Sequence, residues 1–471
     1  MLVIESMVFN TGLDFFIINF RLYVSKLLTF VVKYKRVLIV ILTDFKSPRL
    51  QYVLDFIFKE VFGQDYIIQT SLDSSEGMVL YYGTEFTESH CTLCVTDCGL
   101  LRARGLDIVD NSLIKKEICK YSSWLQDIES AVPDIFSIVF YCLSRYEEYV
   151  TERRDVHGRF LAKNSIMQEN NWVERPIVDE ILKSLATLFY TKYNFNFTKS
   201  NDYRFISTLD IDQAWAYNYK GFEGIFGFGR DLMTFEWRRL ISRLSTLTGR
   251  SKDPFDTYNY IKELHLGNDL VPIFFILAAA KRSKNDRNHS LSHKEFVRLL
   301  HVCLTGFEIG IHPSYRSNDS YDLLEDEMLR LEKLTDKSIR FSRQHFLKME
   351  LPTTYLQLIK AGIERDFTMG YSDSIGYRAG TGHAFMWYDL LNEETTNLRV
   401  QPFQVMDGTL NFYMALTPEV ALSRVLRMME TAKELDSPFC ILWHNSSFDP
   451  NYGWEGWASV YESILKNARK D

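Results

Sequence analysis

The chain lacks an apolar run long enough to cross a membrane. FFIINF (15–20) and LLTFVV (27–32) are apolar, but basic residues at positions 21, 26, 33 and 35 interrupt them, and a span needs about 18 apolar residues or more. A basic segment followed by an apolar stretch and a small-residue cleavage site, the pattern of a secretory signal, is also missing. We therefore expect an unprocessed cytoplasmic protein, with residues 1–35 as an extension outside the first compact domain.

The chain also lacks the cysteine pattern of a secreted, disulfide-stapled protein. It has seven cysteines, an odd number, and several of them are clustered. The segment HCTLCVTDC (90–98) could in principle hold zinc through its histidine and three cysteines. No second CxxC or HxxxH pair follows nearby. The flanking residues therefore favour a buried strand over a zinc site.

Positive charge is scarce as well. The net charge is −7 and no basic stripe stands out along the chain, which argues against nucleic acid as a partner. What the chain does have is 46% hydrophobic and 24% charged residues over 471 positions. That composition is typical of a globular protein, and the length predicts about two or three domains.

The first half predicts a small α/β domain over residues 36–200. KRVLIVILTDF (35–45) is typical of a buried strand, and the following helix has Ser47 as its cap and Pro48 at its first position. Helical periodicity continues over 134–150 and 176–190. Between them TERRDVHGRF (151–160) reads as a charged loop, either solvated or in contact with another domain. The polar stretch 191–202 marks the expected boundary.

The second half alternates strands with helices. The expected strands are 204–210, 270–276, 307–312, 338–345, 367–372, 399–407 and 439–444. Helix 292–304 begins with a capping box of Ser292 and Glu295, and helix 417–435 begins with Thr417 followed by Pro418. This alternation predicts a parallel sheet with helices outside it, and seven units predict a closed or nearly closed barrel.

Polar side chains gather at the carboxyl ends of these strands. They are Asp210, Asp212, His312, His345, Arg378, Asp407 and His444. In a (β/α) barrel these strand ends share one face, and that face carries the active site. We therefore expect residues more than two hundred positions apart to meet in one site.

Five short segments resemble the motifs of a known family. They are STLDIDQAW (207–215), EIGIHPSY (308–315), GYRAG (376–380), QVMDGTL (404–410) and LWHNSSF (442–448). In this order they resemble the polysaccharide deacetylases, the NodB-homology domains of carbohydrate esterase family 4, over residues 201–471. Residues from about 37 to 200 are similar to the N-terminal domain that accompanies some bacterial members.

The resemblance implies a distorted (β/α)7-type barrel that binds a divalent metal, most often Zn²⁺, through one aspartate and two histidines. Asp210 then matches the catalytic base, Asp212 the metal-ligating aspartate and His312 the first histidine ligand. Arg378 matches the arginine that orients the base. His444 matches the general acid, which Asp407 orients.

The sequence departs from the family at the second histidine ligand. That position holds Arg316, and a guanidinium cannot bind a metal. His345 ends the next expected strand, so Asp212, His312 and His345 are the expected ligands. His383 and Asp319 are the rival third ligands. Asp210 and Asp212 point to the same side of their strand and would repel one another without a cation between them.

The expected activity is hydrolysis of the N-acetyl group of a carbohydrate, with five aromatic residues as candidate stacking surfaces: Tyr315, Trp387, Trp443, Trp454 and Trp457. For the last two, core packing is an equal alternative. A non-catalytic carbohydrate-binding barrel with a degenerate metal site is one competing interpretation, motivated by Arg316. An amidohydrolase of a small cytoplasmic amide is another. The oligomeric state is left open.

Overall fold

A computed structural model describes residues 38–71, 78–84, 93–106, 111–124, 132–197, 203–220 and 222–470. The expected extension 1–35 lies outside the described residues, as do His90 and Cys91. The chain forms two compact units, one with residues up to Asp44 and Asp65–Val95, the other with Phe45–Gln64 and Thr96–Asp471. The division at residue 200 stays a prediction.

The first unit holds a four-stranded sheet within the described residues, in the order β2-β1-β3-β4. Its strands are β1 (Ile39–Thr43), β2 (Tyr66–Gln69), β3 (Met78–Gly83) and β4 (Leu93–Thr96). Strand β1 pairs in parallel with both β2 and β3. The strands expected around 35–45 and within 90–98 are therefore confirmed for the described residues.

The second unit begins with helices. They are α2 (Pro48–Leu54), η1 (Asp55–Val61), α3 (Asn111–Trp124), α4 (Ile135–Leu143), α5 (Tyr146–Val150), η2 (Ala162–Asn164), α6 (Ile166–Glu169) and α7 (Ile177–Tyr193). The Oγ of Ser47 accepts from the backbone N–H of Leu50, so the expected cap of α2 is confirmed. The helical periodicity over 134–150 corresponds to two helices, α4 and α5, which Arg145 with a φ of 56° separates.

A nine-stranded sheet organises the rest of the described chain, in the order β10-β11-β9-β8-β7-β6-β5-β13-β12. Its strands are β5 (Phe205–Ile211), β6 (Ile273–Leu277), β7 (Glu308–His312), β8 (Phe341–Ser342), β9 (Arg365–Asp366), β10 (Phe385–Asp389), β11 (Glu394–Val400), β12 (Val405–Met406) and β13 (Phe439–His444). The pairings from β12 through β9 to β11 are parallel, and β10 pairs antiparallel with β11. The mixed α/β class with a parallel sheet is confirmed, but the strand pairings do not show a closed barrel.

Three expected strands differ from the structure. The segment 338–345 contains only the two residues of β8, Phe341–Ser342. The segment 399–407 is divided into β11 and β12 by residues 401–404, which include Pro402, a residue with no N–H to donate to a ladder. The backbone of Gln401 instead donates to Asp366, and that of Gln404 to Cys440. The segment 367–372 contains no strand, because β9 ends just before it.

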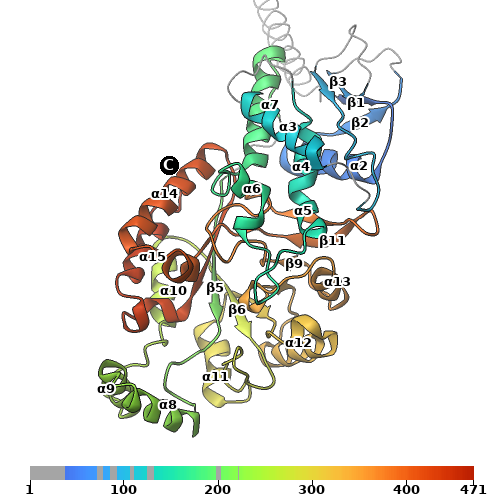
Figure 1. The fold of residues 1–471 in the computed structure, drawn as a ribbon. Helices are drawn as coiled ribbons and strands as arrows, with labels where there is room; N and C mark the ends of the chain where they lie inside the picture. The colour runs from blue at the N-terminus through green and yellow to red at the C-terminus, as the bar shows by residue number, and fades with distance from the viewer. Residues whose placement is uncertain are drawn as a thin grey trace, which may run out of the picture. The chain divides into compact units, whose positions relative to one another are not determined.

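Helices follow the strands, as Figure 1 shows. They are α8 (Phe222–Met233), α9 (Trp237–Leu247), α10 (Tyr258–Gly267), α11 (Lys294–Arg298), η3 (Leu299–Cys303), η4 (Ser317–Asp319), α12 (Tyr321–Thr335), η5 (His345–Leu347), α13 (Thr353–Lys360), η6 (Thr409–Tyr413), α14 (Pro418–Glu434), η7 (Asn445–Phe448), η8 (Asn451–Gly453) and α15 (Trp457–Lys466). Thr417 caps α14 as expected. The expected Ser292 cap is wrong, since the side chain of His293 accepts from the N–H of Glu295.

The interior of the large sheet is filled by a cluster of buried side chains: Phe275, Leu347, Phe367, Phe403, Met406, Cys440 and Leu442. These residues come from β6, β12, β13 and the segments that follow β8, β9 and β11. Among the helices of the described residues, none has both the length and the apolar character needed to cross a membrane.

Candidate metal centre

The carboxyl ends of the parallel strands bring most of the expected site residues together. Asp210 lies near the end of β5 and Asp212 directly after it, His312 ends β7, and His444 ends β13. In the sheet register His444 lies opposite Asp210. His345 follows the short strand β8. The expected gathering at one edge is therefore observed for these residues.

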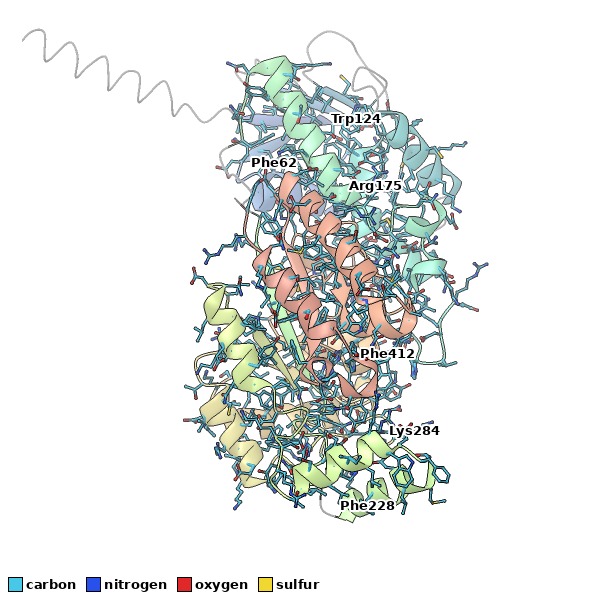
Figure 2. All side chains as sticks on the ribbon, turned by 90° about the vertical axis from the view of Figure 1, so that its left-hand side faces the viewer. Phe62, Trp124, Arg175, Phe228, Lys284 and Phe412 are labelled. Atoms are coloured by element: carbon cyan, nitrogen blue, oxygen red, sulfur yellow. The ribbon has the colours of Figure 1, made fainter. Side chains whose placement is uncertain are left out.

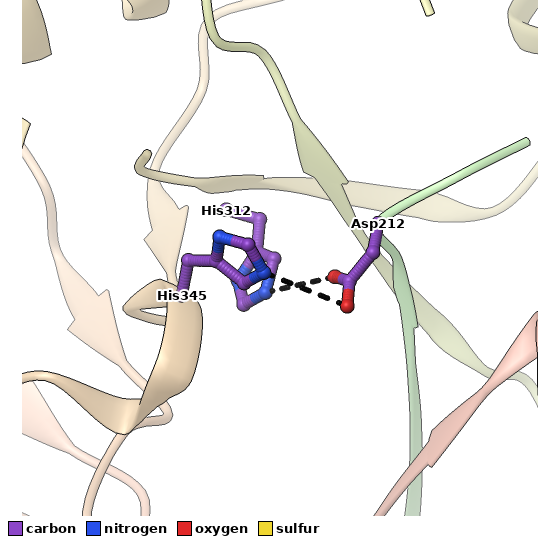
Figure 3. A group of neighbouring side chains, drawn as sticks. All are labelled: Asp212, His312 and His345. Carbon is purple, nitrogen blue, oxygen red and sulfur yellow. Dashed lines mark ion pairs between the residues drawn. The ribbon is translucent and has the colours of Figure 1, made fainter. Parts of the chain in front are cut away.

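Asp212, His312 and His345 converge on one point (Figure 3). The Nε2 atom of His312 lies 3.3 Å from Oδ1 of Asp212, and Nε2 of His345 lies 3.5 Å from its Oδ2. One ligand atom from each residue fits within 4.8 Å of the other two, and no other such group was found among the described residues. The three side chains expected as ligands are thus close enough to share one cation.

Hydrogen bonds fix which nitrogen each imidazole presents. Nδ1 of His312 donates to the carbonyl of Arg343 over 2.5 Å, and Nδ1 of His345 donates to Oδ1 of Asp286 over 3.0 Å. Asp286 is buried and also accepts from the backbone N–H of Tyr315. Both Nε2 atoms are then unprotonated in the neutral rings and point at Asp212, the arrangement typical of metal-ligating histidines.

The donor set fits a divalent metal. Oδ1 of Asp212 is buried and has no hydrogen-bond donor, which is costly for a carboxylate oxygen unless a cation satisfies it. Burial opposes ionisation of Asp212, but His345 and His312 hold its pKa well below the usual range. Burial likewise lowers the pKa of His345, yet Asp212 and Asp286 raise that pKa to about 9. The pocket therefore favours a positive charge at this point, and two nitrogens with one carboxylate suit zinc.

Arg316 and the two rival ligands lie outside this group. Arg316 is exposed and precedes the short helix η4. The carboxylate of Asp319 pairs with Lys348, and the backbone N–H of His383 donates to the hydroxyl of Thr381. Neither rival belongs to the metal-ligating group of the described residues. Arg316, which stands where the family has its second histidine ligand, therefore does not bring a positive charge into the metal site.

Arg343 was not expected in the site, and Arg378 does not take the position expected for it. Nη1 of Arg343 donates to Oδ1 of Asp210 over 2.9 Å, and both side chains are buried. Arg378 instead donates to both oxygens of the buried Glu148, over 2.9 and 2.6 Å. The expected contact between Arg378 and Asp210 is therefore wrong. The sequence signal that could have identified Arg343 is its position in the expected strand 338–345, two residues before His345. A charge buried in such a strand requires a carboxylate partner.

His444 and Asp407 form a tight pair on the other side of Asp212. Nδ1 of His444 donates to Oδ1 of Asp407 over 2.7 Å, and Ser447 donates to the second carboxylate oxygen. Nε2 of His444 lies 3.9 Å from Oδ2 of Asp212. Burial lowers the pKa of His444, but Asp407, followed by Asp212, raises that pKa to about 10. The ring is therefore held with a proton available on Nε2.

A cavity of about 410 Å³ lies over these residues. Its described lining includes five side chains that could contact a substrate: Arg159, Phe346, Phe412, Tyr413 and Trp454. Phe412 and Tyr413 are exposed, so aromatic surface is available at the opening. Of the aromatics expected to stack on sugar, Trp387, Trp443 and Trp457 are buried in the core. For Trp387 and Trp443 the expectation is wrong, and for Trp457 the alternative of core packing holds.

Arg159 comes from the charged loop 151–160 in the first half of the chain. It is only 5% exposed. Its guanidinium pairs with Asp155 and donates to the carbonyl of Phe346 over 3.2 Å and to the hydroxyl of Tyr413 over 3.3 Å. Of the two interpretations of this loop, contact with another part of the chain holds for Arg159. Sequence reasoning missed its place at the cavity, since its partners lie about 190 and 250 positions away.

Comparisons with known proteins identify part of the chain only. Residues 39–194 match a family described as a family of unknown function, DUF7033. This match covers less than half of the chain. No curated protein matches the chain.

Several solved structures are similar to the chain. One is a polysaccharide deacetylase from Mycobacterium smegmatis described as putative, with 12% identity and a TM-score of 0.37, covering 59% of this chain and 88% of its own. Another is the polysaccharide deacetylase Bc1974 from Bacillus cereus, with 11% identity and a TM-score of 0.30, covering 56% and 86%. A third is a CE4 family pseudoenzyme from Bacillus anthracis, with 13% identity and a TM-score of 0.30, covering 58% and 64%. Similarity at this level of sequence identity and TM-score does not indicate an activity for this chain.

Proposed function

We propose that this protein is a metal-dependent hydrolase that removes the N-acetyl group from a carbohydrate. The observation that carries the proposal is the convergence of Asp212, His312 and His345, whose ligand atoms lie within 4.8 Å of one another. Asp210 and His444 adjoin this group, as a base and an acid would in amide hydrolysis.

A divalent ion held by Asp212, His312 and His345 would supply Lewis-acid chemistry, polarising the amide carbonyl and acidifying a water molecule. Asp210 would accept the proton of the attacking water, and Arg343 keeps that carboxylate oriented through its hydrogen bond. His444 would donate a proton from Nε2 to the departing amine, while Asp407 holds the ring through Nδ1. The products are acetate and a free amine.

The shape of the cavity supports a sugar as the substrate. Phe412, Tyr413 and Trp454 line it beside the candidate ligands, and an aromatic face can stack on the apolar face of a sugar ring. The cavity of about 410 Å³ is in the size range of small-ligand sites. Its position over the metal group would place an acetamido substituent near Asp210 and His444.

The first experiment measures bound metal by elemental mass spectrometry. The wild type, His345→Ala and the exposed control His301→Ala are purified side by side and supplied with zinc. About one zinc per chain in the wild type and in His301→Ala, with loss in His345→Ala, is the expected result. Equal metal content in all three variants would contradict the assignment of His345.

The second experiment measures acetate release. Purified protein is incubated with N-acetylated sugar oligomers, with a small acylated amide as the competing substrate. We expect acetate from the oligomers, its loss after chelation and its return with zinc. Sugar binding without turnover at full metal occupancy would instead support the non-catalytic interpretation, and preference for the small amide would support the amidohydrolase.

A further inference from the structure

Helix α9 buries mostly polar residues and exposes apolar ones, the reverse of a helix that packs on a globular core. Its inward residues are Leu240, Arg243 and Thr246, so a largely polar row is buried. Its exposed side carries a row that we call the apolar stripe: Trp237, Ile241, Leu244 and Leu247. The spacing of four, three and three positions places these residues on one helical face. Burial of apolar side chains therefore does not explain why this stripe is apolar.

The turn before α9 extends this exposed surface. Met233 at the end of α8 is 81% exposed and Phe235 in the turn is 74% exposed, while Ile241 on α9 is 66% exposed. Helices α8 and α9 lie side by side in Figure 1, apart from the strands of the large sheet. Scattered exposed hydrophobic residues are normal, but a contiguous patch marks an interaction surface.

The same segment is basic in an acidic protein. Residues 232–252 contain five Lys or Arg residues and one acidic residue, Glu236, whereas the whole chain carries a net charge of −7. Arg238, Arg250 and Lys252 are exposed, close in sequence to the apolar stripe. A surface with this charge favours an anionic partner.

A cavity of about 810 Å³ lies against the inward side of α9. Six basic residues line it: Lys220, Arg239, Arg243, Arg282, Lys284 and Arg287. No acidic residue is among its described lining residues, although Arg243 pairs with Asp231 behind it. Phe228 of α8 and the cavity residue Lys284 both appear in the lower part of Figure 2. Gln213 also lines the cavity, and it directly follows the candidate ligand Asp212 in the sequence.

We propose that the hairpin of α8 and α9 docks on the surface of an anionic lipid bilayer. An outward apolar stripe that begins with tryptophan and is accompanied by arginines is typical of a helix lying in the membrane interface. Anionic headgroups are attracted to basic segments at that depth, and the basic cavity offers a place for them. The helices have 12 and 11 residues, too few to span the bilayer. Docking would bring the candidate metal centre to lipid-borne substrates.

The test is co-sedimentation of the full chain with vesicles. One vesicle type is phosphatidylcholine alone, and the other is phosphatidylcholine and phosphatidylglycerol in equal parts. We expect the protein to sediment with the mixed vesicles and to stay in solution with phosphatidylcholine alone. Added salt should weaken this association, because it screens the basic residues from the headgroups.

Two variants separately test how the apolar stripe and the basic residues contribute to vesicle binding, and each has a matched control. Ile241→Ser combined with Leu244→Ser should lower partitioning at least about tenfold, because two exposed side chains would no longer enter the interface. The control is Leu329→Ser, at an exposed leucine of helix α12. Arg238→Glu should lower partitioning on mixed vesicles, and Lys337→Glu at another exposed position should not. All five positions are exposed, so the fold should tolerate the changes.

Three results would overturn the proposal. The first is no sedimentation of the wild type with either vesicle type. The second is equal sedimentation of the wild type and the Ile241→Ser, Leu244→Ser variant. The third is a dimer in solution that this variant disrupts, without any vesicle binding, which would assign the apolar stripe to a second copy of the chain. The readout needs no bound metal and no turnover.

Discussion

Asp210 and Asp212 stand two positions apart, yet their surroundings give them different chemistry. Asp210 is fully buried and receives a hydrogen bond from Arg343, whereas Asp212 is half-buried and faces two imidazole Nε2 atoms. A cation between the two carboxylates stays a prediction. The proposed function therefore assigns proton transfer to Asp210 and metal binding to Asp212.

Replacing each aspartate by asparagine should separate these roles. Asp210→Asn should keep zinc and lower kcat by about 10² to 10⁴, because the proton acceptor is lost. Asp212→Asn should lower zinc content and turnover together, because a charged ligand is lost. Elemental mass spectrometry and acetate release measure the two effects, with Asp269→Asn at an exposed position as the control. Equal zinc loss from both variants would contradict the assignment of the base.

Arg343 and Arg378 provide a second comparison, between two buried arginines with different partners. Arg343→Lys should lower turnover, because a lysine cannot reproduce the planar contact with Asp210. Arg378→Lys should instead lower the free energy of unfolding by about 1–3 kcal/mol, because the bidentate contact with buried Glu148 is lost.

Urea unfolding and turnover of the folded fraction measure these two effects. If Arg378→Lys lowered kcat as strongly as Arg343→Lys and left the unfolding free energy unchanged, the role implied by family resemblance would hold. The structure gives no contact through which that outcome would arise, since Arg378 bonds to Glu148 and to the carbonyl of Gly370.

At the scale of elements, the loop 151–160 forms part of the wall of the cavity. Arg159 supports the carbonyl of Phe346, the residue after the candidate ligand His345, and Phe346 has a φ of 61°. A non-glycine residue in this region is held there by its surroundings. The loop therefore acts on the position of a ligand without touching it.

Arg159→Ala should lower zinc affinity by about 10- to 100-fold, the range seen when groups that orient ligands are removed. The control is Arg153→Ala, an exposed arginine of the same loop. Zinc affinity is measured by competition with a chelator of known affinity, and KM for an N-acetylated oligomer is measured alongside. Unchanged zinc affinity with a raised KM would show that Arg159 contacts the substrate and does not position His345.

Elements with strong local signals were predicted well from the sequence. The expected strand 439–444 coincides with β13, and the caps Ser47 and Thr417 are as expected, because apolar β-branched runs and capping residues act locally. Strand β9 has only two residues, which is too short for periodicity to reveal. The partner expected for Arg378 was wrong for another reason. A motif identifies the type of residue at a position, but it does not identify the residue that this side chain contacts.

At the scale of the whole molecule, long-range polar contacts join the first half of the chain to the second. The backbone N–H of Val178 donates to the carbonyl of Gly380, and buried Asp179 accepts from Thr381, Gly382 and Ser437. Sequence patterns cannot reveal these contacts, because each partner is a backbone group or an ordinary polar side chain of a helix or loop. The basic cavity beside α9 could not be predicted for a similar reason, because its six basic residues are spread over 220–287.

Stability should depend on pH through buried His289. Its Nε2 donates to the carbonyl of Asn218, and burial lowers its pKa to about 4. In the unfolded chain a histidine has a pKa near about 6.5, so between these values only the unfolded state binds the proton. The contribution of the neutral His289 ring to the free energy of unfolding is therefore complete above about pH 6.5 and is lost as the pH falls toward 4.

We expect the unfolding free energy of the wild type to fall by up to about 2 kcal/mol more than that of His289→Gln between about pH 7 and about pH 5. Glutamine keeps a donor for Asn218 but does not titrate. Urea unfolding at intermediate pH values measures the difference. Parallel pH dependences for the two proteins would show that His289 is protonated in the folded state.

The ion pair between Glu148 and Arg378 has a consequence for how this protein is inherited. Both side chains are buried, and they lie 230 positions apart. A recombination event that brought residues 201–471 to a new gene without the preceding segment would leave Arg378 without its carboxylate, at a cost of several kcal/mol. Selection would then remove such a gene or replace the arginine. We therefore expect the two segments to pass together from ancestor to descendant, with glutamate and arginine exchanged only as a pair.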